Sequence, residues 1–428
     1  MNFQLLHPRD QLVAVMNRIY HSGMTTLSGG NLSILDDNGD IWITPAGVDK
    51  GNLTPQDIMC VDANGRITGP HRPSSELPFH RAIYAARPDL RAIVHAHPPA
   101  LVSFSIARQV PETAVIPQLQ RICGRVGYAP YALTGSEQLG QVIAATFGEG
   151  YNSVMLENHG AVAAGETLLG AFERLETLEF GARTLIRANT LGQINILTAD
   201  QLALFDQPAP ALPEFTPMTH SSQERDLRRQ IADAVRRAVA RQLMLSTAGV
   251  VSARLDADSF LITPTGQDRG AITIEDVVLV RQGQRERGKT PSRAVRLHQA
   301  IYAAQPDIHC IIMAQSPNVM AYATTGTPFD SRTIPESYIW LRRMPLIPYE
   351  TFYTQPQQIA ATISLNTPVI LVQNDCVVVA AKTILQAFDR LEVAEYSARS
   401  LIDTAVIGPL VPIGDEEIRE LEIVFGLT

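Results

Sequence analysis

The sequence has little cysteine, and it has no long hydrophobic run. It contains four cysteines, and none of them form a Cys-x-x-Cys pair, so neither a disulfide scaffold nor a thiolate zinc site is indicated. No apolar stretch is long enough to cross a membrane. The first residues lack a charged start followed by a long apolar run, as a signal peptide would have. We therefore expect a cytoplasmic protein with no membrane partner.

Charge is also sparse, at 18% of residues, and the net charge is −8 with 45% of residues apolar. This balance is typical of soluble globular enzymes and excludes extensive disorder. A mildly acidic chain is a poor ligand for a phosphate backbone, so we expect no nucleic-acid partner. The one basic cluster has the spacing of a solvated helix face. It comprises Arg228, Arg229, Arg236, Arg237 and Arg241.

An internal repeat is the main organisational feature. Three segments of the first half recur in the same order in the second half, at offsets between 216 and 219. The spacing is a whole domain and far exceeds the repeat length of a solenoid, which indicates a duplication. The matching pairs are Ile83–Leu90 with Ile301–Ile308, Ile43–Gly47 with Ile262–Gly266, and Ala171–Glu176 with Ala387–Glu392.

A proline-rich stretch marks the junction between the two copies. The segment Asp206–Pro217 cannot form a regular helix, and a helical pattern with a plausible N-cap begins near Ser221. We predict a first domain over residues 1–205, a linker over 206–220 and a second domain over 221–428.

Helical and strand patterns are mixed within each copy, which predicts an α/β layered domain with a partly antiparallel sheet. In the first copy we expect helices over 10–21, 77–86, 136–147 and 167–188, and strands over 32–35, 40–44, 92–97, 153–156 and 161–164.

Three histidines of the first copy form a candidate metal site. His95 and His97 lie two residues apart in a predicted strand, so both side chains project from the same face. His159 lies in a turn after another strand, where we expect Gly160 to allow a sharp bend. Three imidazoles leave an open position on zinc, as catalytic sites do. An isolated pair of strand histidines could equally be satisfied by hydrogen bonds.

The second copy serves as an internal control for this site. The three histidines align with Met313, Gln315 and Asp375, whereas the surrounding hydrophobic frame is retained. Core packing therefore does not require the histidines, which suggests that they act as a set. Glu76 follows the same pattern, because Ala294 replaces it.

Glu76 stands at the start of the helix predicted over 77–86. A carboxylate there could serve only the helix dipole, but its loss together with the histidines favours a general base. Ser74 and Ser75 precede this helix, and their amides and hydroxyls suit an anion pocket as well as an N-cap by Ser75. The glycine-containing loops 29–31 and 45–47 could add further amides.

In this ordered set of segments the chain resembles the class II aldolase/adducin family, once in each half. The matching segments are Gly30–Ser33, Ile43–Gly47, Ser74–Glu76, His95–His97 and Asn158–Gly160. The resemblance implies two tandem αβα domains, each built around a mostly antiparallel central sheet.

The resemblance also implies the roles of the site residues. His95, His97 and His159 would hold a divalent metal, most plausibly zinc, although manganese, iron or cobalt would also suit such ligands. Glu76 would be the base. Asn31, Gly47, Ser74 and Ser75 would surround a substrate phosphate, together with Ala46, which stands where phosphate-binding relatives often carry a hydroxyl residue.

The implied activity is that of a metal-dependent lyase on a small phosphorylated or acidic sugar derivative. It would cleave a carbon–carbon bond by a retro-aldol reaction through a metal-stabilised enediolate. Two alternatives share this site: a decarboxylase of a 3-oxo sugar acid phosphate, and a sugar-phosphate 4-epimerase. A further alternative of another class is a non-catalytic assembly module, as in adducin.

One departure from the family concerns the tyrosine that acts as its general acid. Arg121 stands near the position of that tyrosine, and an arginine there could hold a carboxylate instead. In the second copy Tyr338 lies within one residue of the tyrosine position. We expect a homodimer that forms a pseudo-fourfold ring, in which Tyr338 completes the metal site. Tyr338 could equally be a surface or packing residue.

Overall fold

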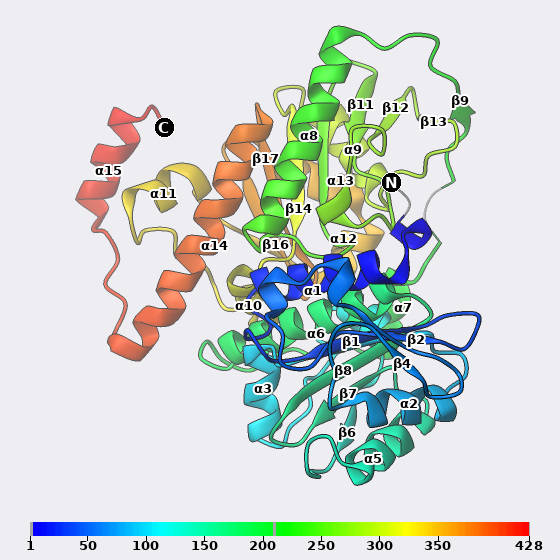
Figure 1. Cartoon of the computed structure of the whole chain (residues 1–428). Helices are drawn as coiled ribbons and strands as arrows, with labels where there is room; N and C mark the ends of the chain where they lie inside the picture. The colour runs from blue at the N-terminus through cyan, green and yellow to red at the C-terminus, as the bar shows by residue number, and fades with distance from the viewer. Residues whose placement is uncertain (1–2, 209–210, 428) are drawn as a thin grey trace. The chain divides into compact units, whose positions relative to one another are not determined.

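The computed structural model describes residues 3–208 and 211–427. The chain divides into two compact units (Figure 1). Of the described residues, the first unit comprises 3–113 and 119–183, and the second comprises 114–118, 184–208 and 211–427. The division falls within two helices, α4 (Pro117–Cys123) and α6 (Leu168–Ala188).

The first unit is built on an eight-stranded sheet in which all strand pairs but one are antiparallel. Its strands in spatial order are β4 (Ile67–Thr68), β3 (Met59–Val61), β2 (Ile41–Ile43), β1 (Asn31–Leu35), β5 (Ala92–Ala96), β8 (Gly160–Gly165), β7 (Ser153–Leu156) and β6 (Gly127–Ala129). The central strands β5, β8 and β7 are buried along their whole length, which explains their nearly continuous apolar sequences.

Helices cover both faces of this sheet (Figure 1). On one face α2 (Leu77–Ala86) packs closely against α5 (Glu137–Gly148), since a Cβ at Gly140 would lie 3.4 Å from the Phe79 Cα. On the other face α1 (Pro8–His21) lies beside α6, with the Arg18 guanidinium 4.6 Å from the Phe172 ring centre. The remaining helix is α3 (Pro99–Ile106), and the short helices are η1 (Phe3–Leu5), η2 (Lys50–Asn52) and η3 (Pro55–Asp57).

The second unit repeats this strand order with one strand added. Its nine strands in spatial order are β15 (Leu346–Ile347), β16 (Val369–Val372), β17 (Cys376–Ala381), β14 (Cys310–Ala314), β10 (Val250–Arg254), β11 (Ser259–Ile262), β12 (Val278–Arg281), β13 (Gln284–Glu286) and β9 (Glu214–Phe215). The shared topology and the antiparallel pairing confirm the prediction of an α/β fold with tandem, mostly antiparallel sheets.

Two separate apolar cores lie against the second sheet, one on each face, as in a three-layer αβα domain. The helices of this unit are α7 (Ala199–Phe205), α8 (Ser222–Ala240), η4 (Arg269–Ala271), α9 (Val295–Ala304), α10 (Pro317–Thr325), α11 (Pro335–Leu341), α12 (Tyr349–Thr354), α13 (Pro356–Thr362), α14 (Ile384–Ile407) and α15 (Asp415–Val424). None of the described helices has the length and apolar character of a membrane-spanning helix.

The expectation for Arg228 is wrong, and the proline-rich junction includes a short strand. The proline-rich junction contains the strand β9, which pairs with β13 as a parallel edge strand, while residues 209–210 lie outside the described part. Arg228 is not on a solvated helix face but is buried, because its guanidinium pairs with the carboxylates of Glu224 and Glu286 at 2.8 and 2.7 Å. These two ion pairs compensate the cost of burying the charge.

Candidate metal centre

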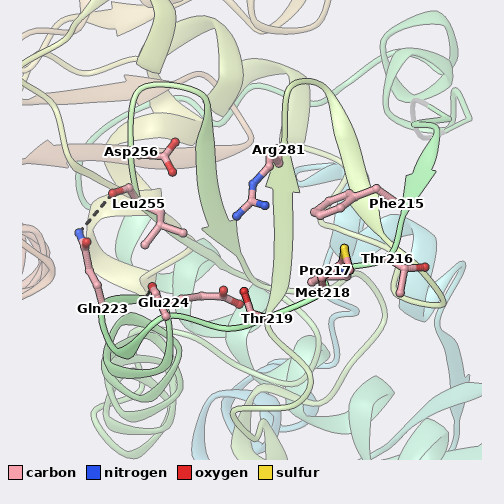
Figure 2. Close-up of a pocket in the computed structure, with 11 residues that line it drawn as sticks. Phe215, Thr216, Pro217, Met218, Thr219, Gln223, Glu224, Leu255, Asp256 and Arg281 are labelled. Carbon is pink, nitrogen blue, oxygen red and sulfur yellow. Dashed lines mark hydrogen bonds between the residues drawn. The ribbon is translucent and has the colours of Figure 1, made fainter.

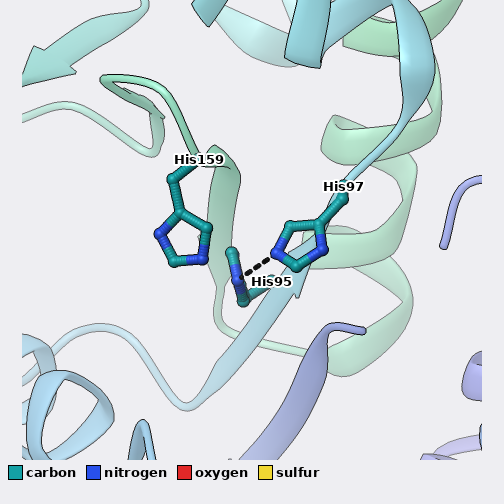
Figure 3. A group of neighbouring side chains, drawn as sticks. All are labelled: His95, His97 and His159. Carbon is teal, nitrogen blue, oxygen red and sulfur yellow. Dashed lines mark hydrogen bonds between the residues drawn. The ribbon is translucent and has the colours of Figure 1, made fainter. Parts of the chain in front are cut away.

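His95 and His97 lie at the end of a central strand. His95 is the fourth residue of β5, and His97 follows directly after the strand ends. Because alternate residues of an extended chain point the same way, both rings project to one side. Figure 3 shows these rings and that of His159 facing one another, with ring centres 4.8 to 5.1 Å apart.

His159 is presented by the tight turn between β7 and β8. The residue that bends the chain is Asn158, whose φ of 52° lies in the left-handed region, and the prediction that Gly160 provides the bend is wrong. Gly160 is needed for space instead. A Cβ there would lie 2.6 Å from the Ala96 carbonyl oxygen and 2.8 Å from His97 Cδ2. The His159 amide donates to Ser105 Oγ at 3.1 Å, which anchors the turn.

The donor atoms fit a divalent metal ion. His95 Nδ1 donates to the Ala161 carbonyl at 3.0 Å, so its Nε2 carries the lone pair. His97 Nε2 lies 3.1 Å from His95 Nε2. Two nitrogens bound to tetrahedral zinc at about 2.0–2.1 Å would lie roughly 3.3 Å apart. The three ligand atoms all lie within 4.8 Å of one another.

Burial keeps these imidazoles in the neutral form that a metal requires. It lowers the pKa of His97 to about 4, with His159 adding to the effect. Burial, and then the neighbouring His97 and His159, hold the pKa of His95 well below its ordinary value. Burial also lowers the pKa of His159, and Glu76 opposes that shift. All three side chains therefore offer lone pairs at neutral pH.

Glu76 faces the histidines from the N-terminus of α2, where it is the N-cap residue and is 8% exposed. Its Oε2 lies 3.3 Å from His95 Nε2, and its Oε1 lies 3.5 Å from His159 Nε2. The Asn31 amide donates to Oε2 at 2.7 Å. Oε1 is buried and has no hydrogen-bond partner among the described residues. A buried, unpaired carboxylate oxygen beside three imidazoles is suited to exchanging a proton with a bound molecule.

The loops expected to surround an anion lie together next to Glu76. Pro45 and Pro73 form an isolated antiparallel bridge, and the Ser74 amide donates to the Thr44 carbonyl at 3.2 Å. The α2 helix has no side-chain cap, because the Ser74 hydroxyl accepts from the amide of Glu76 itself at 3.2 Å, while Ser75 is exposed.

Further along the same loop, Gly47 is exposed and has a φ of 68°. A Cβ there would meet no atom within 4 Å, so the space around this residue is open. Ala46 is half-buried, with its amide already donated to the Arg72 carbonyl at 2.9 Å.

The two residues expected near the family's tyrosine position lie on helices that carry none of the three histidines. Arg121 is exposed on α4 in the first unit. Tyr338 lies on α11 in the second unit, and its hydroxyl donates to Glu422 of α15 at 2.6 Å.

The equivalent place in the second unit has different chemistry. Gln315 donates its side-chain amide to the Asp375 backbone carbonyl at 2.9 Å, and the Asp375 carboxylate accepts from the Tyr353 hydroxyl. Among the described residues, the triad of the first unit is the only group of three or more histidine, cysteine or acidic side chains placed to hold a metal.

A separate hollow of about 440 Å³ lies in the second unit (Figure 2). Phe215, Leu255, Asp256 and Arg281 line part of it, and Gln223 donates to the Leu255 carbonyl at 3.2 Å across its edge. The lining residues include no histidine or cysteine, so this hollow lacks the donor set found in the first unit.

Sequence reasoning missed the side chains behind Glu76. His80 Nε2 lies 2.5 Å from Asn31 Oδ1, and His80 Nδ1 lies 2.6 Å from Ser33 Oγ. The available signal was that His80 recurs as His298 in the second copy, although the metal-site histidines do not recur.

Two segments of the chain, residues 10–186 and 229–402, match a family model described as the class II aldolase and adducin N-terminal domain. A 5-deoxy-D-ribulose 1-phosphate aldolase from Bacillus thuringiensis serovar kurstaki is 32% identical over 200 residues, which cover 45% of this chain and 91% of that protein. A 3-oxo-tetronate 4-phosphate decarboxylase from Escherichia coli is 32% identical over 201 residues, which cover 46% and 93%. An L-fuculose phosphate aldolase from Methanococcus maripaludis is 32% identical over 169 residues, which cover 40% and 91%.

Proposed function

The chain belongs to the class II aldolase and adducin family in both of its halves, and on that premise we propose that its first half is a metal-dependent lyase. It cleaves a carbon–carbon bond of a small phosphorylated or acidic sugar derivative by a retro-aldol reaction. The observation that carries this proposal is the convergence of His95, His97 and His159 beside the carboxylate of Glu76. Curated relatives of similar identity include aldolases that act on sugar phosphates.

His95, His97 and His159 would hold the metal through ring nitrogens, and zinc suits three neutral imidazoles best. The hydrogen bond from His95 Nδ1 to the Ala161 carbonyl fixes which nitrogen is free. When bound, the metal supplies Lewis-acid polarisation of a substrate carbonyl. The surrounding protein limits the access of water to the rings, because His95 is fully buried and His97 is half-buried.

Glu76 acts as the base, and its reactive atom is Oε1. Oε2 already accepts from the Asn31 amide, whereas Oε1 has no partner among the described residues and points toward His159. In retro-aldol cleavage the hydroxyl beside the breaking carbon–carbon bond loses its proton as it becomes the aldehyde, and the carbon released on the other side takes up one proton. Oε1 can carry that proton because it is the carboxylate oxygen left free beside the triad.

The N-terminus of α2 binds the acidic end of the substrate. The exposed hydroxyl of Ser75 and the exposed Gly47 of the neighbouring loop are the groups left open there, because the Leu77 and Phe79 amides already donate to the Ser74 and Glu76 carbonyls. The helix dipole favours a phosphate at a helix N-terminus. Ser74 supports this pocket by accepting a hydrogen bond from the Glu76 amide, which fixes the backbone just before the helix.

Decarboxylation is a second candidate, and Arg121 favours it. Arginine replaces the tyrosine acid at this point of the chain, and a guanidinium binds carboxylates in a way that a phenol does not. A curated relative of equal identity is a 3-oxo-tetronate 4-phosphate decarboxylase.

We infer that the second half is a degenerate partner domain. In this proposal residues 1–205 and 221–428 are the duplicated domains, joined by residues 206–220. Two chains form a pseudo-fourfold ring in which Tyr338 of one domain completes the site of another. Met313 and Gln315 in place of histidine support the loss of the second site.

The test is a screen of purified, metal-loaded protein against sugar phosphates and 3-oxo acid phosphates, with aldehyde and carbon dioxide measured separately. Aldehyde release supports retro-aldol cleavage, and carbon dioxide release supports the decarboxylase instead. His97→Ala should abolish turnover and metal binding, whereas Gln315→Ala at the matching position of the second copy should change neither. Turnover that survives in the His97→Ala variant would overturn the proposal.

A further inference from the structure

A buried chain of hydrogen bonds runs from the sheet to the carboxylate of Glu76. The Tyr84 hydroxyl lies 2.7 Å from Ser33 Oγ, which lies 2.6 Å from His80 Nδ1. His80 Nε2 lies 2.5 Å from Asn31 Oδ1, and Asn31 Nδ2 lies 2.7 Å from Glu76 Oε2. His80 and Ser33 are completely buried, and Asn31 is 4% exposed.

The chemistry of the groups sets one direction of donation along this chain. A carboxylate only accepts, so the Asn31 amide nitrogen faces Glu76 and its carbonyl oxygen faces His80. His80 must therefore carry its proton on Nε2, which leaves Nδ1 to accept from Ser33. Ser33 in turn accepts from Tyr84. Burial lowers the pKa of His80 to about 3, which keeps this ring in its single-proton form.

The second copy separates the structural part of this chain from the functional part. Ser252 Oγ lies 2.7 Å from both His298 Nδ1 and the Tyr302 hydroxyl, so the serine–histidine–tyrosine group is retained. His298 Nε2 faces the sulfur of Met313 at 3.2 Å. Val250 occupies the place of Asn31, because Asn31 pairs with His95 in the first sheet and Val250 pairs with Met313, which replaces His95, in the second. The asparagine is thus lost together with the carboxylate.

We propose that Asn31 is the positioning residue of Glu76, and that His80 holds Asn31 in the required orientation. This inference rests on the proposed function, because it takes Glu76 as the base. An amide cannot pass a proton on, so the chain orients the carboxylate and does not relay protons from the interior. Glu76 therefore exchanges its proton at Oε1, on the side of the triad.

This role differs from the substrate contact expected for Asn31 from sequence. Both ends of its amide are already engaged, by Glu76 and by His80. The amide nitrogen carries a second N–H, but only 4% of the residue is exposed. Asn31 thus acts on the reaction through Glu76.

The decisive variant is Asn31→Val, which introduces the residue that the second copy tolerates at this place. We expect kcat to fall about 100-fold, within the range typical of general-base loss. KM and the amount of bound metal should change by less than about twofold, and Tm by no more than about a few degrees. A crystal structure of the metal-loaded variant should show the Glu76 carboxylate displaced from its place beside His95. A raised KM with an unchanged kcat would assign Asn31 to substrate binding and overturn the proposal, as would an undisplaced carboxylate.

A matched pair of variants separates positioning from folding. His80→Leu and His298→Leu each remove a buried histidine from the same hydrogen-bonded group and should lower Tm alike. Only His80→Leu should lower kcat, and equal effects on kcat would overturn the proposal. Glu76→Gln distinguishes this failure from failure of the proposed function. If Glu76→Gln retains full activity, Glu76 is not the base. If Glu76→Gln is inactive while Asn31→Val is fully active, only the positioning role is refuted.

Discussion

Gly160→Ala tests how tightly the fold around the triad constrains His97. The new methyl group would lie 2.6 Å from the Ala96 carbonyl oxygen and 2.8 Å from His97 Cδ2. Ordinary contacts between such atoms begin near 3.5 Å, so the ring or the backbone must move by roughly 0.8 Å. The Ala96 carbonyl belongs to the buried strand β5, so we expect His97 to give way first.

The consequence for metal binding is large, since ligand distances tolerate only about 0.2 Å. Displacing a ring that is one of three ligands should weaken metal affinity by about 10- to 100-fold, the usual cost of disturbing a ligand's support. Overpacking should also lower the free energy of unfolding by about 1–3 kcal/mol. In the second copy Cys376 takes the place of Gly160, since each pairs with the last residue of the preceding strand.

The assay is titration of the metal-free protein with zinc in competition with a chelator of known affinity, alongside thermal unfolding. The control is Cys376→Ala, which changes the equivalent position of the second copy and should leave zinc affinity unchanged. Zinc affinity in Gly160→Ala equal to that of the unmodified protein would refute the argument that this glycine makes room for a metal ligand.

Three further outcomes follow from buried or hydrogen-bonded groups. Burial lowers the pKa of both His80 and His298 to about 3 from the ordinary 6.5. The folded state therefore binds fewer protons than the unfolded one below pH 6.5, and stability is lost as the pH falls toward 3. Each histidine should lower the free energy of unfolding by about 2 kcal/mol between pH 7.5 and pH 5, as measured by urea unfolding. His298→Gln should make the free energy of unfolding less dependent on pH. Arg228→Met removes the cation of buried Glu224 and one of the two cations of Glu286, which keeps Lys289 at 2.8 Å, and it should lower stability by about 3–5 kcal/mol at neutral pH; a loss under 1 kcal/mol would contradict this expectation. Tyr338→Phe should lower kcat for aldol cleavage about 100-fold if this hydroxyl serves a neighbouring site, and unchanged turnover would reject that role.

The triad was predictable because strand periodicity and the internal repeat can both be read directly from the sequence. A spacing of two residues puts His95 and His97 on one side of any strand. The second copy then shows that the frame persists without them, which is how His159 and Glu76 could be added to the set from distant parts of the chain. The strand arrangement also follows from pattern, because both copies have apolar segments of strand length separated by turn residues.

The remaining features depend on contacts between distant segments. Arg228 has the spacing of a solvated face, yet a glutamate from a different hairpin draws it into the interior. Asn31 resembles a loop residue near a substrate, but its amide is held between His80 and Glu76, which lie 49 and 45 residues away. Asn158 adopts the left-handed backbone of the turn, while Gly160, two residues further on, leaves room for the Ala96 carbonyl and the His97 ring. No local sequence pattern encodes these contacts between distant segments.

The most direct measurement is the metal content of the purified full chain, determined by elemental analysis. We predict one divalent ion per chain, held by the first half. His159→Ala removes one of the three ligands and should reduce the content to background while the protein stays folded. Two ions per chain, or one ion that persists in the variant, would contradict the assignment of a single centre to His95, His97 and His159.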